Sequence, residues 1–380
     1  MKDGYRIRIK GKKMVSGLVA AALLMSGTAA FPAGAQTAET PVIEYAALVE
    51  LVKGSNPQVQ AKRADLDRWL DAYQQARDEI MSNRDNLRDD AKELKDNGDA
   101  EGARHYQDQA KMLKDSADQL DKQIRSLNSA SNTMEIRLAE DTAAMSAQDV
   151  MTTWNSLKLD LDSARAKLEA AAYKKDLAQR QLGLGMGTQA DVNQLEDARQ
   201  EAENKVQSLE GEMGQLKREL CMLTGYEAGA QVEIGGLPAP ETERAAGLDL
   251  EADKKTAWGN SYELRQQRHS GFSGTNKERH SRDRSIEDAE QNMYTSLTAL
   301  YQQVQTARTT CQAAESAYAA AQLDWKAAQH KMDLGSMNRE DYLNAQAQYM
   351  EVRAKSGQAE IGLLGAMQRY DWAVKGLILD

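Results

Sequence analysis

The sequence predicts an all-α protein built from two tandem, long antiparallel helical hairpins, and three observations lead to this prediction. Of the 380 residues, 28% are charged, only 5% are aromatic and five are proline, which favours long helices over a compact sandwich or barrel. Most of the apolar content is alanine, leucine, valine and methionine, residues that suit close helix contacts. Two segments also repeat each other at a fixed distance and carry a helical hydrophobic spacing.

The first 35 residues have the composition of a secretory signal peptide. Residues 1–13 carry six lysine or arginine side chains against one aspartate, and residues 14–31 are apolar or small up to the small-residue site that ends at Ala35. We expect cleavage after Ala35. The alternative, an N-terminal membrane anchor, fits less well because the apolar core is short and is interrupted by a glycine and a serine. An exported protein of the cell envelope is therefore predicted, in the periplasm, associated with the outer membrane or on the extracytoplasmic surface.

Charge and motif content bear on the possible function classes. Removal of six positive and one negative charge with residues 1–35 changes the net charge from −10 to −15, which disfavours a nucleic-acid partner. We find no catalytic pattern, and we predict no enzyme, no cofactor and no metal, since the four histidines lack metal-ligand spacing. The glycines at 183, 185 and 187 lack the preceding strand and the Gly-Lys-Ser/Thr ending of a phosphate loop, so they indicate a turn.

A repeat with an offset of 150 residues organises the chain. The octet Leu184–Asp191 (LGMGTQAD) is answered by Leu334–Asp341 (LGSMNRED), and ten positions downstream of each octet follow a 3,4 spacing. This 3.5-residue period over five heptads predicts a helix with a coiled-coil seam after each octet. The first seam consists of Val192, Leu195, Arg199, Ala202, Val206, Leu209, Met213, Leu216, Leu220 and Leu223, and the second consists of the same numbers plus 150.

Each octet has the features of a tight turn between two antiparallel helices. Thr188 and Asn338 are good N-cap residues, and each is followed three positions later by an aspartate in a capping-box-like position. A glycine before each N-cap ends the incoming helix. Two roles are open for these aspartates. They neutralise the helix N-termini, a contribution of ~0.3–1 kcal/mol each, or they also contact a partner.

The first repeat is expected to be longer than the second. The repeats begin alike at residues 55–59 and 260–264, an offset of 205, so the first has 55 more residues between its start and its octet. Outer turns are predicted at Asn97-Gly98-Asp99 and within Gly271–Asn276, and the first hairpin should project further by about 36–46 Å. The domain prediction is a first repeat at 36–224, a Gly/Pro linker at 225–247 and a second repeat at 248–380.

A helix, a turn of the form Leu-Gly-x-x-[Ser/Thr/Asn]-x-x-Asp and a second helix, all occurring twice, resemble the TolC family of outer-membrane efflux proteins. The resemblance is best over 160–240 and 292–379. It implies an α-barrel protomer, a homo-oligomer (a trimer), and tips that meet a periplasmic adaptor, or membrane fusion protein, which works with an inner-membrane pump. The tip residues carried over are Gly185, Gly187, Thr188, Asp191, Gly335, Asn338 and Asp341.

The sequence also departs from that family. The arginine usual four residues before the first tip glycine is replaced by Gln181, and by Lys331 in the second copy. The family's barrel strands should lie near the outer turns, but residues 84–101 and 269–287 are too densely charged to face lipid, so we expect the helical fold without the β-barrel. The predicted function is a TolC-like component of an efflux or secretion assembly; the alternative is a non-transporting exported coiled-coil scaffold or surface protein.

The cysteines and the larger seam residues are expected to have structural roles. In an antiparallel bundle with level tips, Cys221 and Cys311 differ in height by roughly 13 Å, whereas a disulfide needs Cα atoms ~4.4–6.8 Å apart. Both thiols are therefore predicted to be free. Met213, Tyr349 and Tyr370 lie on the seams and are predicted to pack there, in preference to forming a ligand site.

Overall fold

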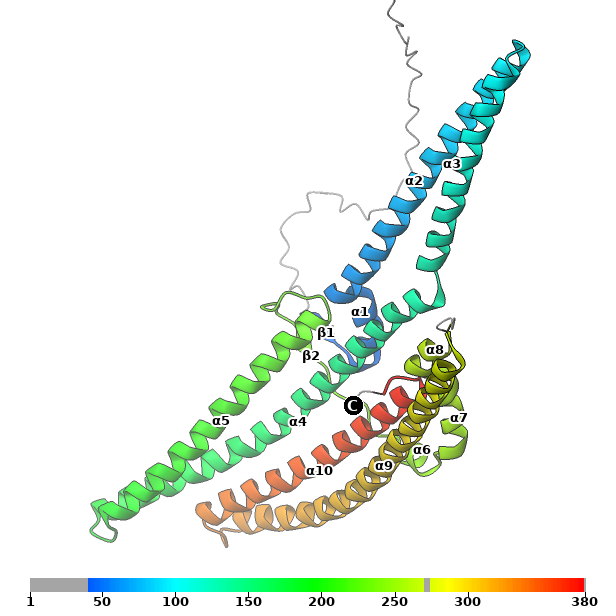
Figure 1. Cartoon of the computed structure of the whole chain (residues 1–380). Helices are drawn as coiled ribbons and strands as arrows, with labels where there is room; N and C mark the ends of the chain where they lie inside the picture. Colours follow the sequence, from blue (N-terminus) through cyan, green and yellow to red (C-terminus); the bar gives the residue numbers. More distant parts are fainter. Residues whose placement is uncertain (1–39, 270–273, 379–380) are drawn as a thin grey trace, which may run out of the picture. The chain divides into compact units, whose positions relative to one another are not determined.

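The computed structural model describes residues 40–269 and 274–378, so the predicted signal peptide and residues 271–273 of the second predicted outer turn lie outside the described part. Nearly all regular structure in the described part is helical (Figure 1), and the predicted all-α class of helical-hairpin repeats is confirmed. In chain order the elements are β1 (Val42–Ile43), α1 (Tyr45–Ser55), α2 (Pro57–Asp96), α3 (Ala100–Leu127), α4 (Ala130–Gly183), α5 (Gln189–Leu223), β2 (Glu233–Ile234), α6 (Thr242–Ala246), α7 (Leu250–Asn260), α8 (Tyr262–His269), α9 (Asn276–Asp333) and α10 (Arg339–Val374).

Two antiparallel hairpins, α4/α5 and α9/α10, carry the repeated octets as their turns (Figure 1). All ten predicted seam positions of each copy are buried or half-buried, so the 3,4 spacing correctly marked the face that packs. Helix α10 packs against α9 and also along α4. The second contact is close, because a Cβ on Gly357 would lie 2.6 Å from Cδ1 of Leu159.

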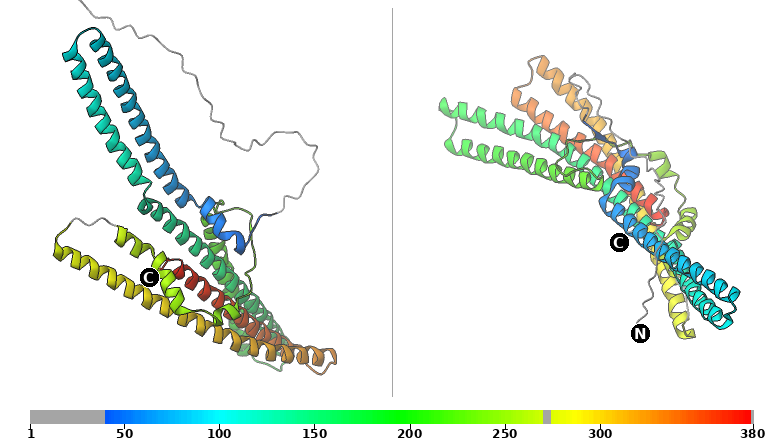
Figure 2. Two further views of the ribbon diagram at one scale, coloured as in Figure 1. Left: turned by 90° about the vertical axis from the view of Figure 1, so that its right-hand side faces the viewer. Right: turned by 90° about the horizontal axis from the view of Figure 1, so that it is seen from above.

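Helices α2 and α3 form a further hairpin (Figure 2). Its turn falls at residues 97–99, where Gly98 has a φ of +87°. The fully buried positions of α3 are Ala103, Ala110 and Ala117, spaced by seven residues, and Ala91 is buried on α2. These alanines alternate along the packed faces with larger side chains that are only half-buried, such as Leu87, Leu113 and Leu120.

The longer first repeat is visible in its helix lengths. Helix α2 has 40 residues, whereas α8, which follows the corresponding start in the second repeat, has eight. The returning arm is divided at Asn128 and Ser129, which cap the end of α3 and the start of α4, whereas α9 runs through 58 residues. Asparagine and serine are weak helix formers in a helix interior, which is consistent with the division here, although the Ser129 side chain makes no cap bond.

The segment predicted as a linker, 225–247, contains two regular elements. Strand β2 pairs in parallel with β1, with Val42 opposite Glu233 and Ile43 opposite Ile234. Helix α6 follows and packs against α9. The glycines and prolines therefore lie between short ordered elements that connect this segment to both the start of the described chain and the second repeat.

The start of each repeat is bonded to the end of its last helix by an asparagine. In the first repeat Nδ2 of Asn56 donates to the carbonyl of Leu223 at 3.0 Å, while Oδ1 of Asn56 caps α2 by accepting from the amides of Gln58 and Val59. In the second repeat Nδ2 of Asn260 donates to the carbonyl of Val374 at 3.1 Å. Each bond satisfies a carbonyl that the helix end leaves unpaired.

In both repeats, a glycine lies beside the asparagine contact. Gly225 and Gly376 have φ values of +78° and +101°, and each follows the last helix of its repeat. A Cβ on Gly225 would lie 2.4 Å from the carbonyl oxygen of Ser55, and one on Gly376 would lie 2.3 Å from that of Asn260. Both positions thus require glycine for backbone conformation and for space.

The apolar side chains form two main clusters. One contains residues of α1, α4, α5 and the β1/β2 pair, and the other contains residues of α6 to α10. Cys221 is buried in the first cluster and Cys311 in the second, and both are free thiols, as predicted. Within the described part of the chain, no helix is long and apolar enough to cross a membrane.

Candidate functional site

The candidate site consists of the two octet turns. In the first turn, hydrogen bonds cap both the end of α4 and the start of α5. Gly185 has a φ of +72° and ends α4 in a Schellman motif, in which the amide of Met186 donates to the carbonyl of Gln181 at 2.9 Å. Thr188 then starts α5 with a capping box: its hydroxyl accepts from the amide of Asp191, and its own amide donates to the Asp191 carboxylate at 3.1 Å. The Thr188 hydroxyl also donates to the Asp191 carboxylate at 2.6 Å, and this bond first, then the bond from the Thr188 amide, lower the pKa of Asp191.

The second turn has nearly the same geometry. Gly335 has a φ of +68°, and the amide of Ser336 donates to the carbonyl of Lys331 at 2.9 Å, which gives the same Schellman pattern. Asn338 caps α10 by accepting from the amide of Asp341 at 2.8 Å. The Asp341 carboxylate accepts a hydrogen bond from Nδ2 of Asn338 at 2.8 Å, so the side chains of Asn338 and Asp341 also bond to each other.

Large apolar side chains stand exposed on these turns, a feature that the sequence reasoning did not single out. Leu184 and Met186 are 75% and 76% exposed, and Leu334 is 67% exposed. Each leucine lies directly before a left-handed glycine and outside the heptad seam. This position is the sequence feature from which its exposure could have been inferred. A helical turn needs a glycine and a cap, so the exposed leucines add nothing to the turn itself.

The predicted tip residues thus gather in two places. Gly185, Gly187, Thr188 and Asp191 lie on the first turn, and Gly335, Asn338 and Asp341 lie on the second. Both turns are at the same end of the side-by-side hairpins α4/α5 and α9/α10 (Figure 1). Six of the seven residues are exposed, and Gly187 is half-buried.

The seams next to the two turns differ in chemistry. In the second hairpin Trp325 packs between Tyr342 and Tyr349, with ring centroids 5.0 and 5.7 Å apart. The equivalent positions of the first hairpin, 150 residues earlier, are Lys175, Val192 and Arg199. Arg199 there pairs with Glu196 at 2.7 Å and with Glu203 at 2.9 Å. The first hairpin therefore has ion pairs along α5 where the second has aromatic packing between α9 and α10.

Ion pairs also join the hairpins to each other. Lys167 of α4 contacts Glu351 of α10 at 2.8 Å, and Arg339, the first residue of α10, contacts Glu169 at 3.2 Å. Glu351 also accepts from Lys355, and the two lysines lower the pKa of its carboxyl to about 2. Both ion pairs join α4 to α10, and the pair of Arg339 lies beside the second turn.

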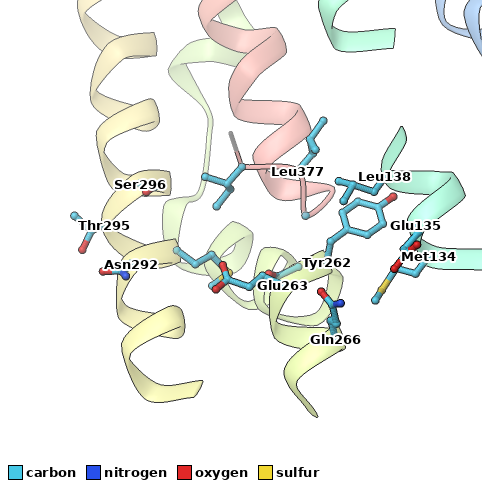
Figure 3. Close-up of a pocket in the computed structure, with 14 residues that line it drawn as sticks. Met134, Glu135, Leu138, Tyr262, Glu263, Gln266, Asn292, Thr295, Ser296 and Leu377 are labelled. Atoms are coloured by element: carbon cyan, nitrogen blue, oxygen red, sulfur yellow. The ribbon is translucent and has the colours of Figure 1, made fainter. Parts of the chain in front are cut away.

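A cavity of about 560 Å³ lies far from the turns, between the start of α4, α8, α9 and residues 376–378 (Figure 3). Tyr262 extends from α8 toward α4, where its hydroxyl donates to Asp141 at 2.7 Å, and Lys53 contacts the same carboxylate at 2.8 Å. Burial and the bond to Asp141 raise the pKa of Tyr262 well above its ordinary value, so this tyrosine stays a donor. The lining groups are apolar, hydroxyl, amide and carboxylate.

No cluster of three or more histidine, cysteine, aspartate or glutamate side chains in the described part of the chain is arranged to hold a metal ion. The fold and the two octet turns define a class: a protein of tandem helical hairpins whose two repeated turns lie at one end.

Comparisons with known proteins then describe what this chain is similar to. No protein-family model matches the sequence, and a search of curated proteins finds no match. Several solved structures match at low identity. The outer-membrane channel OprN matches with 12% identity over 87% of this chain and 89% of that chain, at a TM-score of 0.49.

Two further matches are also channels. The Campylobacter jejuni CmeC outer membrane channel matches with 9% identity over 70% of this chain and 68% of that chain, at a TM-score of 0.44. The Neisseria gonorrhoeae MtrE outer membrane channel matches with 11% identity over 87% of this chain and 89% of that chain, at a TM-score of 0.40. At identities and TM-scores this low, the alignments assign no activity or residue role to this chain.

Proposed function

We propose that this protein is a TolC-like component of a cell-envelope efflux or secretion assembly, which docks an adaptor protein through the turns Leu184–Asp191 and Leu334–Asp341. The observation that carries the proposal is the pair of exposed leucines, Leu184 and Leu334, each held next to a left-handed glycine on a turn of the same geometry. Apolar side chains projecting from rigid turns suit insertion into a groove between helices of a partner.

The sequence resemblance supports the remaining parts of the proposal. The mature chain would follow an export signal, assemble as a homo-oligomer, a trimer by that resemblance, and work with a membrane fusion protein and an inner-membrane pump. The seven tip residues named above would form or shape the contact. Gly185 and Gly335 would set the direction of each turn, and the capped helix starts would present Asp191 and Asp341.

The test replaces the apolar tips without altering the turns. Leu184→Ser combined with Leu334→Ser removes two exposed side chains, and surface changes of this kind usually shift stability by less than ~0.5 kcal/mol. The matched control is Leu323→Ser, because Leu323 is 68% exposed on α9 and lies outside both octets. Binding of the purified adaptor proteins of the same organism is measured for each variant by pull-down and by titration, alongside melting curves.

We expect the double tip variant to lose adaptor binding at least ten-fold while the Leu323 variant binds like the wild type. Equal recovery of the adaptor by all three proteins would refute docking through the tips and would favour the alternative, an exported helical scaffold that does not transport. A matched loss in the Leu323 variant would also count against the proposal, because it would trace binding to general surface hydrophobicity.

A further inference from the structure

The cavity of about 560 Å³ in Figure 3 is used by neither the turns nor the proposed docking. Its floor is buried, since Met293 of α9 and Leu377 are 5% and 3% exposed. The rim is formed by exposed polar residues of three helices, Glu135, Glu263, Gln266, Asn292 and Thr295. An apolar floor under a polar rim, in a volume within the ~300–1,000 Å³ usual for ligand pockets, is the arrangement of a small-molecule site.

The rim carries two negative charges. Glu135 at the start of α4 and Glu263 of α8 are the charged members of the described lining, which includes no lysine, arginine or histidine. Oε1 of Glu263 accepts from Nε2 of Gln267 at 3.1 Å, and among the described residues neither glutamate forms an ion pair with a lysine or an arginine. Because both glutamates are exposed, a bound molecule can reach their carboxylates.

The cationic side chains that are close in sequence to the lining lie elsewhere. Nε of Arg265 donates to a backbone carbonyl near the end of α7 at 2.8 Å. The Lys375 ammonium lies over the ring of Trp372, 4.6 Å from its centroid. Arg137 is exposed on α4, roughly 160° around the helix axis from Glu135. The charges of the lining itself therefore favour a cation and oppose an anion.

The remaining lining selects a molecule that also has an apolar part. Five apolar side chains contribute to it, Met134, Leu138, Met293, Leu377 and Ile378. They come from α4, α9 and the segment that follows α10, and Figure 3 shows Leu138 and Leu377 on different elements around the cavity. A hydrophobic body that covers these side chains removes apolar surface from water.

We propose that this cavity binds a small amphipathic cation, with an ammonium group beside Glu135 and Glu263 and an apolar or aromatic body over Met293 and Leu377. Such a ligand would contact α4 of the first repeat together with α8 and α9 of the second. The site is separate from the two octet turns, and the proposal does not depend on adaptor docking.

Three probes that share one phenylbutyl body test the class of ligand. At neutral pH, 4-phenylbutylamine is a cation, 4-phenylbutanol is uncharged and 4-phenylbutyrate is an anion. Binding of each to the full mature chain is measured by isothermal titration and by saturation-transfer NMR. We expect the amine to bind about three- to ten-fold more tightly than the alcohol, the effect of two exposed charge pairs, and the anion to bind most weakly. The preference for the amine should shrink between ~0.01 M and ~1 M salt, because salt screens exposed charges.

Variants at the rim locate the site. Glu135→Gln combined with Glu263→Gln keeps the size of both exposed side chains and should reduce the affinity for the amine to that for the alcohol. The matched control is Glu79→Gln combined with Glu93→Gln, which changes the net charge equally at two exposed positions of α2. This control should bind all three probes like the wild type.

A further variant fills the cavity. Ser296 is half-buried in the lining on α9, so Ser296→Trp should weaken binding of both the amine and the alcohol at least ten-fold. Its control is Ser208→Trp at an exposed position of α5, and melting curves verify that each variant folds.

Two results would overturn the proposal on the wild-type chain: equal affinity for the amine and the alcohol, or no binding of the amine at millimolar concentration. Two more would do so on the variants: amine binding that is unchanged in the Glu135/Glu263 variant, or an equal loss in the Glu79/Glu93 control.

Discussion

Glycines of left-handed conformation differ sharply in their surroundings, and this difference predicts which of them tolerate a side chain. Gly185 on the first turn has a φ of +72°, and a Cβ added to it would have nothing within 4 Å. Gly225 at the end of α5 has a φ of +78°, but its Cβ would lie 2.4 Å from the carbonyl oxygen of Ser55 and 2.9 Å from Ser55 Cβ. Alanine at the two positions therefore probes the same backbone strain with and without a steric clash.

The expected magnitudes follow from this geometry. Gly185→Ala should cost ~1–2 kcal/mol, the strain of a left-handed residue that has a Cβ. Gly225→Ala carries the same strain and an overpacking cost of ~1–3 kcal/mol, for a total of ~2–5 kcal/mol. As a control, Gly211→Ala in the middle of α5, where nothing lies within 4 Å, should gain ~0.5–1 kcal/mol because alanine favours helix.

Urea unfolding followed by circular dichroism measures all three changes, provided that the variants share one m-value. The order of stability should be Gly211→Ala, wild type, Gly185→Ala and then Gly225→Ala. If Gly225→Ala proves no more costly than Gly185→Ala, the close contact between the end of α5 and Ser55 does not exist in solution. The same comparison holds for Gly335 and Gly376 in the second repeat.

Two further predictions concern buried polar groups. Burial raises the pKa of the Cys221 thiol, and burial with Glu315 raises that of Cys311 to about 11, so a disulfide reagent near neutral pH should modify neither thiol in the folded chain and both after unfolding. Since unfolded thiols ionise near pH ~8.5, the stability contributed by the protonated Cys311 thiol is complete below that pH and is lost as the pH rises toward 11. Equal rates of thiol modification in the folded and the unfolded chain would contradict the burial of both thiols. Trp372→Phe leaves Oε1 of Gln148 without its donor and should cost ~1–3 kcal/mol, whereas Trp69→Phe at a 58% exposed position should change stability by less than ~0.5 kcal/mol, and equal effects in urea unfolding would refute the buried bond.

The parts of the fold that were predictable from sequence depend on local chemistry. The turn at Thr188 requires a cap, a following aspartate and a preceding glycine, and these lie within one octet that appears twice. The seams were predictable because a 3,4 spacing of apolar residues can be recognised within a single helix. The free state of Cys221 and Cys311 followed from their positions along the helices.

The parts that were missed depend on contacts between distant segments. The β1/β2 pair joins Val42 to Glu233 across 191 residues with only two residues in each strand, too few to show an alternating pattern. The fit of Gly225 against Ser55 and the bond between Trp372 and Gln148 have no local signature either. For the candidate site, capping was predictable, whereas the exposure of Leu184 and Leu334 became clear only when the seams were placed in space.

The burial pattern of the α2/α3 hairpin has a consequence for hydrogen exchange. Its fully buried residues are mostly alanines, and its larger apolar side chains, such as Leu87 and Leu113, are only half-buried, so it buries little apolar area at ~0.8 kcal/mol per methylene-sized group. Helix α10, by contrast, buries leucine, methionine, tyrosine and tryptophan side chains between two neighbours. The amides of α2 and α3 should therefore exchange through local openings of low free energy, and those of α10 only when much of the bundle opens. A partner that binds the α2/α3 hairpin would therefore slow amide exchange in α2 and α3 and leave the exchange rates of the other helices unchanged.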